Sequence, residues 1–242
     1  MTNIILNFFN INYTFFTLWD YPMSYLEFFG TLLNILSVYL VAKKNIWSWP
    51  IGIIATILFG VLFYQIQLYS DFFEQIYFLV TGFWGWWLWK KMSAKSKGDK
   101  TKQIDLKFNS FKLNMILLTG IVVGTGVLGY LMSNIHLYFP ALFPVAATFA
   151  YLDAFTTVMS FVANMLLAYK RIENWMIWIT VDVIGIWLYY AKGVRFVSLL
   201  YVIFLVIATS GLIMWLKDYK KNKSLNQTYE KRNYNRKILP VT

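Results

Sequence analysis

The sequence predicts an all-α integral membrane protein with seven transmembrane helices as 3+1+3, in which two parallel three-helix repeats are joined by a linker helix. Three observations predict this fold: the apolar composition, the placement of the basic residues, and a weak internal repeat. Of the 242 residues, 59% are hydrophobic and 14% are charged, whereas a soluble domain has about 45–50% apolar and about 25% charged residues. This composition excludes a soluble enzyme, a disordered protein and a secreted module.

Seven segments are apolar and long enough to cross a bilayer, which takes about 20 residues. In order along the chain they are residues 25–41, 47–66, 72–89, 113–132, 143–169, 175–191 and 197–216. Ahead of them, residues 4–18 are apolar but short, which predicts a helix lying in the membrane interface. After them, residues 218–242 are polar and basic, and we expect a flexible tail.

These segments divide the chain into five expected parts. They are an N-terminal interfacial segment (1–22), a first three-helix repeat (23–92), a basic cytoplasmic loop with the linker helix (93–140), a second three-helix repeat (141–217) and a basic cytoplasmic tail (218–242).

The basic residues predict the direction of the helices. Seven spans place 20 of the 22 Lys and Arg residues on one side of the membrane, and only Lys192 and Arg195 on the other. Because loops rich in Lys and Arg stay in the cytoplasm, we expect the N-terminus outside and the C-terminus inside. The net charge of +11 then reflects topology and contact with anionic lipid, so membrane lipid is an expected partner and nucleic acid is not.

A shift of 129 residues aligns the two halves of the chain. It places Trp49 on Trp178 and Trp86 on Trp215, and it also matches asparagine, isoleucine and glycine pairs. Spans one to three and five to seven cross the membrane in the same order, so the two units are parallel. A parallel copy needs one extra crossing, which the fourth span supplies. Carriers built from repeats bind their substrate near the midplane, between the units.

The sequence offers little for catalysis or metal binding. It has no cysteine and one histidine, His136, which excludes thiolate and histidine-rich metal sites. It lacks the glycine-rich loop that binds phosphates in nucleotide hydrolases. Its spans carry neither a Ser–His arrangement nor a convincing pair of carboxylates. We therefore expect no enzyme activity, no metal and no cofactor.

Asp182 is the most central ionisable residue of the predicted spans, because it is the eighth residue of the segment 175–191. An ionisable group at that depth is costly and is by default a functional residue. Trp175, Trp178, Asp182 and Tyr189 recur at i, i+3, i+7 and i+14 and so share one helix face. A carboxylate beside indole rings suits a cationic aromatic ligand, because indole faces attract cations. We expect no second buried acid nearby.

Structural alternatives stay open for the candidate residues. A protonated Asp182 could bond a neighbouring helix, and Trp175 could belong to an interfacial aromatic belt. Gln75, whose amide both donates and accepts, could orient a carboxamide or join two helices. Asn34 and Asn164, which a shift of 130 aligns, are candidate ligands or interhelical hydrogen-bonding residues.

Three motifs make the chain resemble the PnuC family of nicotinamide riboside transporters. They are Gln-Ile-Gln-Leu-Tyr at 65–69 followed by Gln75, Gly-Trp-x-x-Trp at 85–89, and Glu-Asn-Trp-x-x-Trp at 173–178. The resemblance covers most of the expected membrane domain, from about residue 27 to 89 and again from 153 to 215.

The resemblance implies a fold similar to that of a full-length SWEET carrier, assembled as a homotrimer in the bacterial inner membrane. It also implies facilitated diffusion, with the substrate trapped by cytoplasmic phosphorylation. Trp178, Asn174 and Gln75 correspond to substrate-binding residues of the family. Where relatives have asparagine at the centre of the sixth span, this chain has Asp182, so the role of that residue stays open.

The chemistry of nicotinamide riboside agrees with these residues. Its pyridinium ring, ribose and carboxamide could be bound by a midplane acid, tryptophan faces and an amide side chain. We expect the substrate to be the riboside and not its mononucleotide, because no predicted span has a central Lys or Arg that could bind a phosphate. Two alternatives remain: a SWEET-type sugar carrier, which would not need Asp182, and a proton-coupled carrier, in which Asp182 would relay protons.

Overall fold

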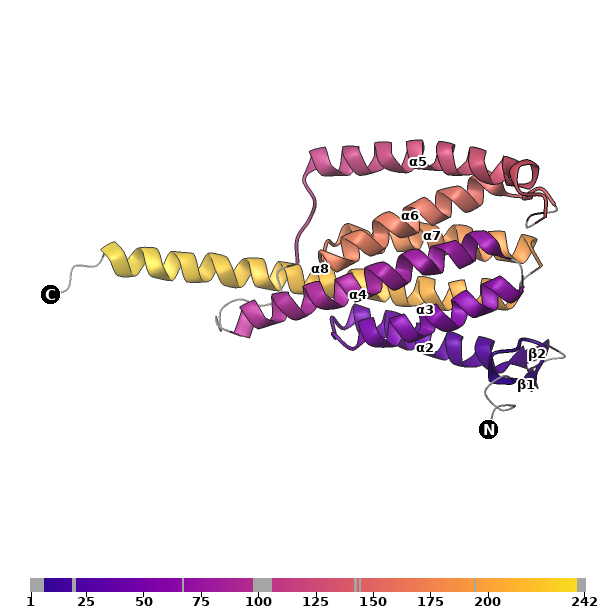
Figure 1. Cartoon of the computed structure of the whole chain (residues 1–242). Helices are drawn as coiled ribbons and strands as arrows, with labels where there is room; N and C mark the ends of the chain where they lie inside the picture. Colours follow the sequence, from indigo (N-terminus) through magenta and orange to yellow (C-terminus); the bar gives the residue numbers. More distant parts are fainter. Residues whose placement is uncertain are drawn as a thin grey trace.

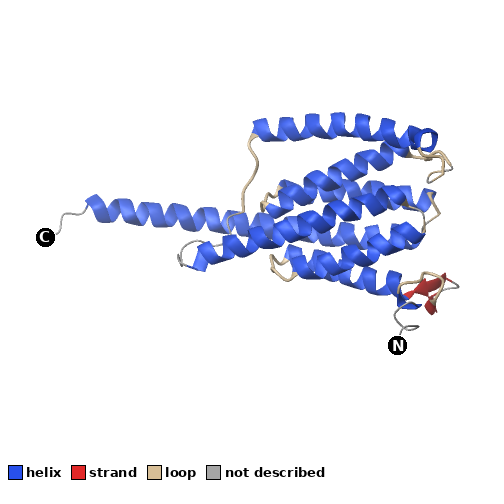
Figure 2. Ribbon diagram, in the orientation of Figure 1, coloured by secondary structure: helices blue, strands red, loops and turns tan. Residues whose placement is uncertain are grey.

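The structure is a computed structural model that describes residues 7–18, 21–66, 68–97, 106–141, 143, 145–193 and 195–238. The described residues form seven long helices and a two-stranded sheet, and the helices run side by side (Figures 1 and 2). The elements are β1 (Thr14–Leu18), β2 (Tyr21–Ser24), α2 (Tyr25–Ala42), α3 (Ser48–Gln65), α4 (Tyr69–Lys97), α5 (Phe111–Tyr138), α6 (Ala150–Ala168), α7 (Glu173–Ala191) and α8 (Arg195–Ile238).

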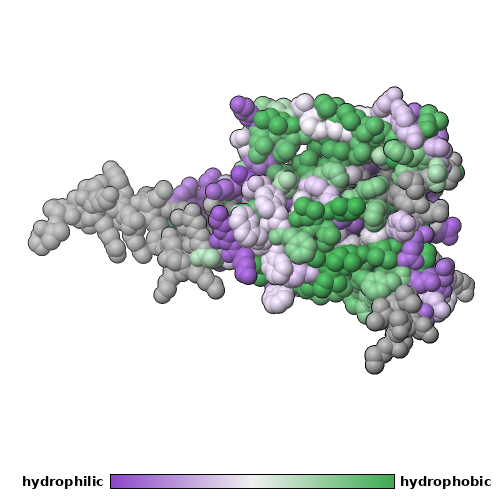
Figure 3. All heavy atoms as spheres, viewed as in Figure 1, coloured by the Kyte–Doolittle hydropathy of each residue, from purple (hydrophilic) through white to green (hydrophobic). Residues whose placement is uncertain are grey.

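Length and hydropathy mark five helices of the described chain as able to cross a membrane: α2, α3, α5, α6 and the Arg195–Leu225 part of α8. Helices α4 and α7 are as long, and they pack between these apolar helices, with α4 against α3 and α6, and α7 against α6 and α8. Figure 3 shows an apolar band around the middle of the bundle and hydrophilic residues toward its ends. The protein is therefore a multi-pass membrane protein.

The seven helices follow the seven predicted spans, with differences at their ends. Helix α6 begins at Ala150, seven residues after the predicted start at 143. Helix α4 continues to Lys97 and α8 to Ile238, where the sequence predicts a basic loop and a flexible tail. Lysine, glutamine and glutamate are good helix formers, so a polar composition marks where a helix leaves the membrane and not where it ends. Residues 98–105 of the predicted loop lie outside the described residues.

The segment before α2 contains a β-hairpin, so the prediction of an interfacial helix over 4–18 is wrong for its described second half. Strand β1 pairs antiparallel with β2, and its Thr and Phe residues favour strands. Residues 1–6 and 19–20 lie outside the described residues.

The hairpin is joined to α2 by a capping box. The Ser24 hydroxyl accepts a hydrogen bond from the Glu27 N–H, and the Glu27 carboxylate accepts one from the Ser24 N–H at 2.8 Å. Tyr21 donates its hydroxyl proton to the same carboxylate at 2.5 Å. Burial, and then the nearby Glu27, raise the pKa of the Tyr21 phenol above its usual range, so this hydroxyl stays a donor at physiological pH.

Contacts between helices follow a simple order. Helix α3 contacts α2 and α4, and α7 contacts α6 and α8. Further contacts join α2 to α8 and α4 to α6. Helix α5 packs on α6 at the edge of the bundle, and α8 projects beyond the bundle at one end (Figure 1).

An equivalent indole hydrogen bond ties α4 to α6 and α8 to α2. Trp89 donates its Nε1–H to the backbone carbonyl of Ala168 at 3.1 Å, and Trp215 donates to the carbonyl of Ala42, also at 3.1 Å. Trp89 is 1% exposed and Trp215 is completely buried. The two donors are 126 residues apart, and so are the two acceptors.

The same spacing recurs in the packing around these indoles. Trp49 meets Trp89 edge-on with ring centroids 5.5 Å apart, and Trp175 meets Trp215 in the same way at 5.5 Å. The sequence alignment at 129 instead pairs Trp49 with Trp178. The two spacings differ by close to one helical turn, and tryptophans recur three residues apart in α4 and α7. The neighbouring registers therefore share similar residue types.

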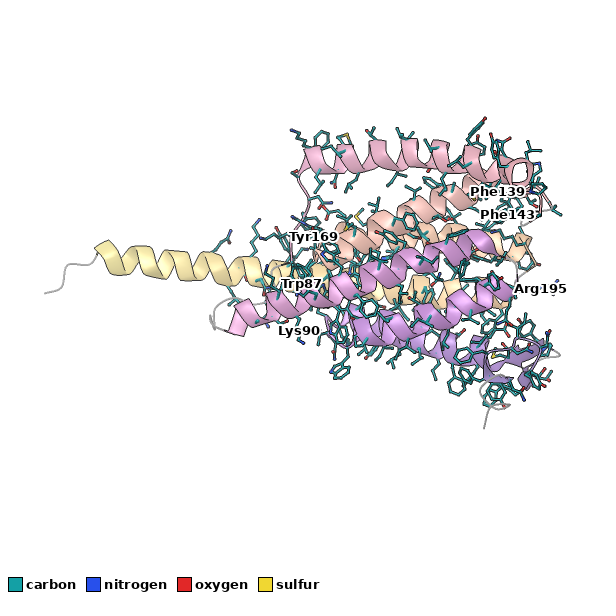
Figure 4. The ribbon with its side chains drawn as sticks, viewed as in Figure 1. Trp87, Lys90, Phe139, Phe143, Tyr169 and Arg195 are labelled. Carbon is teal, nitrogen blue, oxygen red and sulfur yellow. The ribbon has the colours of Figure 1, made fainter. Side chains whose placement is uncertain are left out.

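Aromatic and basic side chains mark the two ends of the bundle. Figure 4 places Trp87, Lys90 and Tyr169 toward the end from which α8 projects, and Arg195 at the opposite end. Trp87 is 56% exposed, and the Lys91 ammonium lies 5.1 Å from its ring. This arrangement is typical of an interfacial aromatic belt with a basic anchor.

Candidate functional site

The helices line a cavity of about 210 Å³. By the same measure a single water molecule needs about 10–15 Å³, so the cavity has room for a small organic molecule. Its lining comes from α2, α3, α4, α6, α7 and α8, and it combines aromatic rings with carboxyl, amide and hydroxyl groups. Helix α5 contributes no lining residue.

Helix α7 directs its predicted face toward the cavity. Trp175, Trp178, Asp182 and Tyr189 all line the cavity, as expected for residues that share one helix face. Trp175 is only 1% exposed, which rules out the interfacial belt considered for it. Asp182 is 3% exposed and has no hydrogen bond or ion pair with any residue that the structure describes. The alternative in which it bonds a neighbouring helix therefore has no contact to support it.

Helix α4 adds two carboxyl groups that the sequence analysis missed. Asp71, Glu74 and Gln75 lie on one face of α4 and line the same cavity as Asp182. Asp71 is 8% exposed and accepts a hydrogen bond from the Tyr189 hydroxyl of α7. The expectation of no second buried acid is therefore wrong. Asp71 precedes Gln75 by four residues and so shares its helix face, but both acids lie near the outer end of the predicted span 72–89, where spacing alone does not indicate burial.

Aromatic rings from three helices shape the cavity. Trp178 of α7 lies near Phe78 of α4, with ring centroids 6.3 Å apart. Tyr189 stacks on Tyr201 of α8 at 5.1 Å. Gly185 is required for this close approach, because a Cβ there would lie 2.4 Å from the Tyr201 ring. Aromatic faces next to a carboxyl group can bind a cation through the ring quadrupole.

Three of the predicted amide side chains also line the cavity: Gln75, Asn34 and Asn164. Asn164 of α6 additionally donates to the Thr81 hydroxyl of α4 at 2.7 Å, so it joins two helices as well as facing the cavity. Gln75 donates to the Asp71 carbonyl of its own helix at 3.3 Å. No hydrogen bond of Gln75 to another helix is found among the described residues.

Asn174 is the predicted site residue that does not line the cavity. It is completely buried in the first turn of α7, where its amide donates to the backbone carbonyl of Arg171 at 2.5 Å. Its neighbour Trp175 faces the cavity, and successive residues of a helix point in directions about 100° apart. Seven of the eight predicted residues thus lie around a common cavity, and Asn174 stabilises the start of α7.

The fold and the cavity define the class of the protein. A polar and aromatic cavity between the helices of a multi-pass bundle is typical of a membrane carrier. In the described ranges, no group of three or more His, Cys, Asp or Glu residues is arranged to hold a metal ion.

Comparison with known proteins identifies the family. The model of the family described as nicotinamide mononucleotide transporter matches residues 24–217, so the chain belongs to this PnuC-type family of membrane transporters. The nicotinamide riboside transporter PnuC of Escherichia coli (strain K12) is 26% identical over 221 residues, which cover 84% of this chain and 90% of the relative. The riboflavin/roseoflavin transporter RibM of Streptomyces davaonensis is 24% identical over 206 residues, which cover 85% and 91%.

A solved structure has the same fold. The crystal structure of the vitamin B3 transporter PnuC superimposes with a TM-score of 0.64 at 24% identity, and the match covers 82% of this chain and 83% of that one. The family consists of transporters and not of enzymes.

Proposed function

We propose that the protein carries nicotinamide riboside across the membrane. The observation that carries this proposal is Asp182, a buried carboxyl group that lines the cavity, has no partner among the described residues, and lies one helical turn from Trp178. A pyridinium ring would stack on that indole with its charge near the carboxylate. The Gln75 amide would bind the carboxamide, and Asn34 and Asn164 the ribose hydroxyls.

The charge of the lining favours the riboside over the mononucleotide. None of the described lining residues is Lys or Arg, the residues that recognise phosphate through charged hydrogen bonds. The buried carboxyl groups would instead repel a phosphate. A neutral sugar or riboflavin would leave Asp182 without a counter-charge, so both are weaker candidates.

Proton coupling is a second candidate, because Asp71 and Glu74 line the same cavity as Asp182. Chains of intramembrane acids serve as proton relays in transporters. We favour facilitated diffusion, in which cytoplasmic phosphorylation traps the substrate. In proteoliposomes, passive transport would equalise the riboside concentration whether or not a pH gradient is present, whereas a coupled carrier would concentrate it against its gradient.

For the architecture, we propose two parallel three-helix units, α2–α4 and α6–α8, joined by α5. The matching indole contacts at a spacing of 126 residues support this arrangement. The cavity lining follows the same spacing: Thr56 and Asp182 both line it, as do Asn34 and Ser160. Substrate would then bind between the units, and the cavity would open by rocking one unit against the other.

The proposed assembly is a homotrimer in the bacterial inner membrane. Helix α5 packs on α6 and exposes Ile116, Val122 and Val127, each more than half exposed. A helix that is apolar on so much of its surface is suited to contact with lipid or with a second copy of the chain.

The proposed topology places the N-terminus outside and the C-terminus in the cytoplasm. The chain contains no cysteine, so single cysteines can report on each side. We expect Asn12→Cys to react with a membrane-impermeant maleimide in intact cells, and Lys220→Cys to react only after permeabilisation. Both positions are exposed in the structure. Labelling of Lys220→Cys in intact cells would contradict this orientation.

Calorimetric titration of the detergent-purified protein tests the proposed substrate. We expect nicotinamide riboside to bind. Nicotinamide and glucose should bind at least about a hundredfold more weakly, because each has only some of the groups that the proposed site would contact. Heat from glucose with none from the riboside would support a sugar carrier and overturn the proposal.

A further inference from the structure

The cavity contains more acidic side chains than one cation requires. Asp71, Glu74 and Asp182 all line it, and its described lining has no basic side chain. Burying a carboxylate in a membrane protein is costly unless a positive charge compensates it. The proposed interaction of Asp182 with a pyridinium ring leaves the two acids of α4 unexplained.

These two acids lie together toward the N-terminal end of α4. Asp71 accepts a hydrogen bond from the Tyr189 hydroxyl, and Glu74 and Ser160 of α6 line the same cavity. Tyr201 lines the same cavity and stacks on Tyr189, with ring centroids 5.1 Å apart. The acids therefore share one aromatic wall with Asp182.

The cation beside the Tyr189 ring does not fill this space. The Lys192 ammonium lies 2.6 Å from the Asp153 carboxylate and 5.1 Å from the centre of the Tyr189 ring. It is not one of the residues that line the cavity. The partner of this ammonium is therefore Asp153, and neither Asp71 nor Glu74 forms an ion pair with Lys192.

The two acids are separated from Asp182 along the bundle. Asp71 bonds Tyr189, which is seven residues from Asp182 on α7, or about 10 Å at 1.5 Å per residue. Asp71 therefore approaches α7 about two helical turns along the chain from Asp182. The acids of α4 thus form a position distinct from the one at Asp182.

We propose that Asp71 and Glu74, with the ring of Tyr201, form an outer subsite that binds a cationic heteroaromatic ring and makes the cavity select cations over neutral analogues of the same shape. This inference rests on the proposed function and deepens it. A cation entering at the end of the bundle where α4 begins meets the outer subsite first and passes to Trp178 and Asp182. Neutral or anionic analogues gain nothing from the two carboxylates.

A purely structural role makes a different prediction. If the acids only hold α4 against α7 and α6, the amide variants Asp71→Asn and Glu74→Gln would lower stability and weaken all ligands equally. A subsite instead changes the preference between ligands that differ in charge. The ratio of two affinities is therefore the informative quantity, and it is insensitive to partial loss of folded protein.

The test compares nicotinamide riboside with its neutral 1,4-dihydro form, which keeps the ribose and the carboxamide. Affinities are measured by calorimetry on wild-type protein, Asp71→Asn, Glu74→Gln and the control Asp218→Asn. Asp218 pairs with Lys44 and does not line the cavity. We expect wild type and the control to prefer the cation, and each α4 variant to reduce that preference by about fivefold or more. An unchanged preference in both α4 variants would overturn the subsite.

A second ligand pair separates this inference from the proposed function. Thiamine carries a cationic thiazolium ring, and riboflavin is neutral. If wild type binds neither form of nicotinamide riboside but binds thiamine, and Glu74→Gln reduces the preference for thiamine over riboflavin, the proposed substrate is wrong and the subsite stands. If wild type binds the neutral compound of each pair as tightly as the cation, the subsite is wrong whatever the substrate.

Discussion

Replacing Asp182 with alanine is expected to weaken the binding of nicotinamide riboside by about thirtyfold or more. Removing one partner of a buried charged pair typically costs about 2–5 kcal/mol, and 1.4 kcal/mol corresponds to a factor of ten. Asp182 is 3% exposed and has no described partner that could take over its role. Calorimetry on the detergent-purified variant measures the effect, and transport into proteoliposomes should fall with it.

Trp178→Ala tests the aromatic contact at the same position. Loss of the cation–π contact and of the stacking surface is expected to weaken binding by about tenfold. Trp87→Ala is the matched control, because Trp87 is 56% exposed and does not line the cavity. Full affinity in both Asp182→Ala and Trp178→Ala would contradict the assignment of the site, provided that both variants remain folded and monodisperse.

The helix face of α7 could be predicted from the sequence because two simple rules agree there. An acid at the centre of an apolar span marks a functional position, and a spacing of three to four residues marks its neighbours on the same face. Trp178, Asp182 and Tyr189 line the cavity as a result. In a regular helix, the spacing along the sequence determines which residues share a face.

The acids of α4 could not be placed in this way. Depth in a membrane is estimated from the ends of apolar segments, and Asp71 lies where the predicted span begins. In the folded protein, the contact between Asp71 and Tyr189 brings this end of α4 against the end of α7. That contact joins residues 118 positions apart, and no local pattern encodes it. Asn174 belongs to a motif that the sequence analysis identified, but it does not line the cavity, because it lies about 100° around the helix from Trp175.

The spacing of the proposed internal repeat could not be determined by matching residues in the sequence. Indoles three residues apart give similar matches at 126 and at 129, and only contacts decide between them. The hydrogen bonds of Trp89 and Trp215 to the ends of α6 and α2 favour 126. At this spacing Trp178 corresponds to Gly52 and Asp182 to Thr56, and all four residues line the cavity. Trp178 and Asp182 would then be residues at which the second unit has diverged from the first.

Gly85→Ala and Gly211→Ala are expected to destabilise the protein strongly and to similar extents. A Cβ at Gly85 would lie 2.2 Å from the Trp49 ring, and one at Gly211 would lie 2.8 Å from the Trp175 ring. Both indoles are buried, at 6% and 1% exposure, so neither has free space into which to move. Overpacking of a well-packed interior costs about 1–3 kcal/mol and occasionally more. The midpoint of thermal unfolding in detergent should therefore fall by several degrees for each variant.

Gly126→Ala is the matched control for these substitutions. It is also a glycine within a helix, but a Cβ there meets nothing within 4 Å, and alanine is favoured over glycine in a helix by about 1 kcal/mol. This variant should be as stable as wild type or slightly more so.

If the destabilisation of Gly85→Ala comes from the clash with Trp49, the double variant Gly85→Ala/Trp49→Phe should recover part of the lost stability. The corresponding pair Gly211→Ala/Trp175→Phe should behave alike, because equivalent halves should respond to equivalent changes. A large loss at one glycine with none at the other would contradict the proposed equivalence of the two three-helix units.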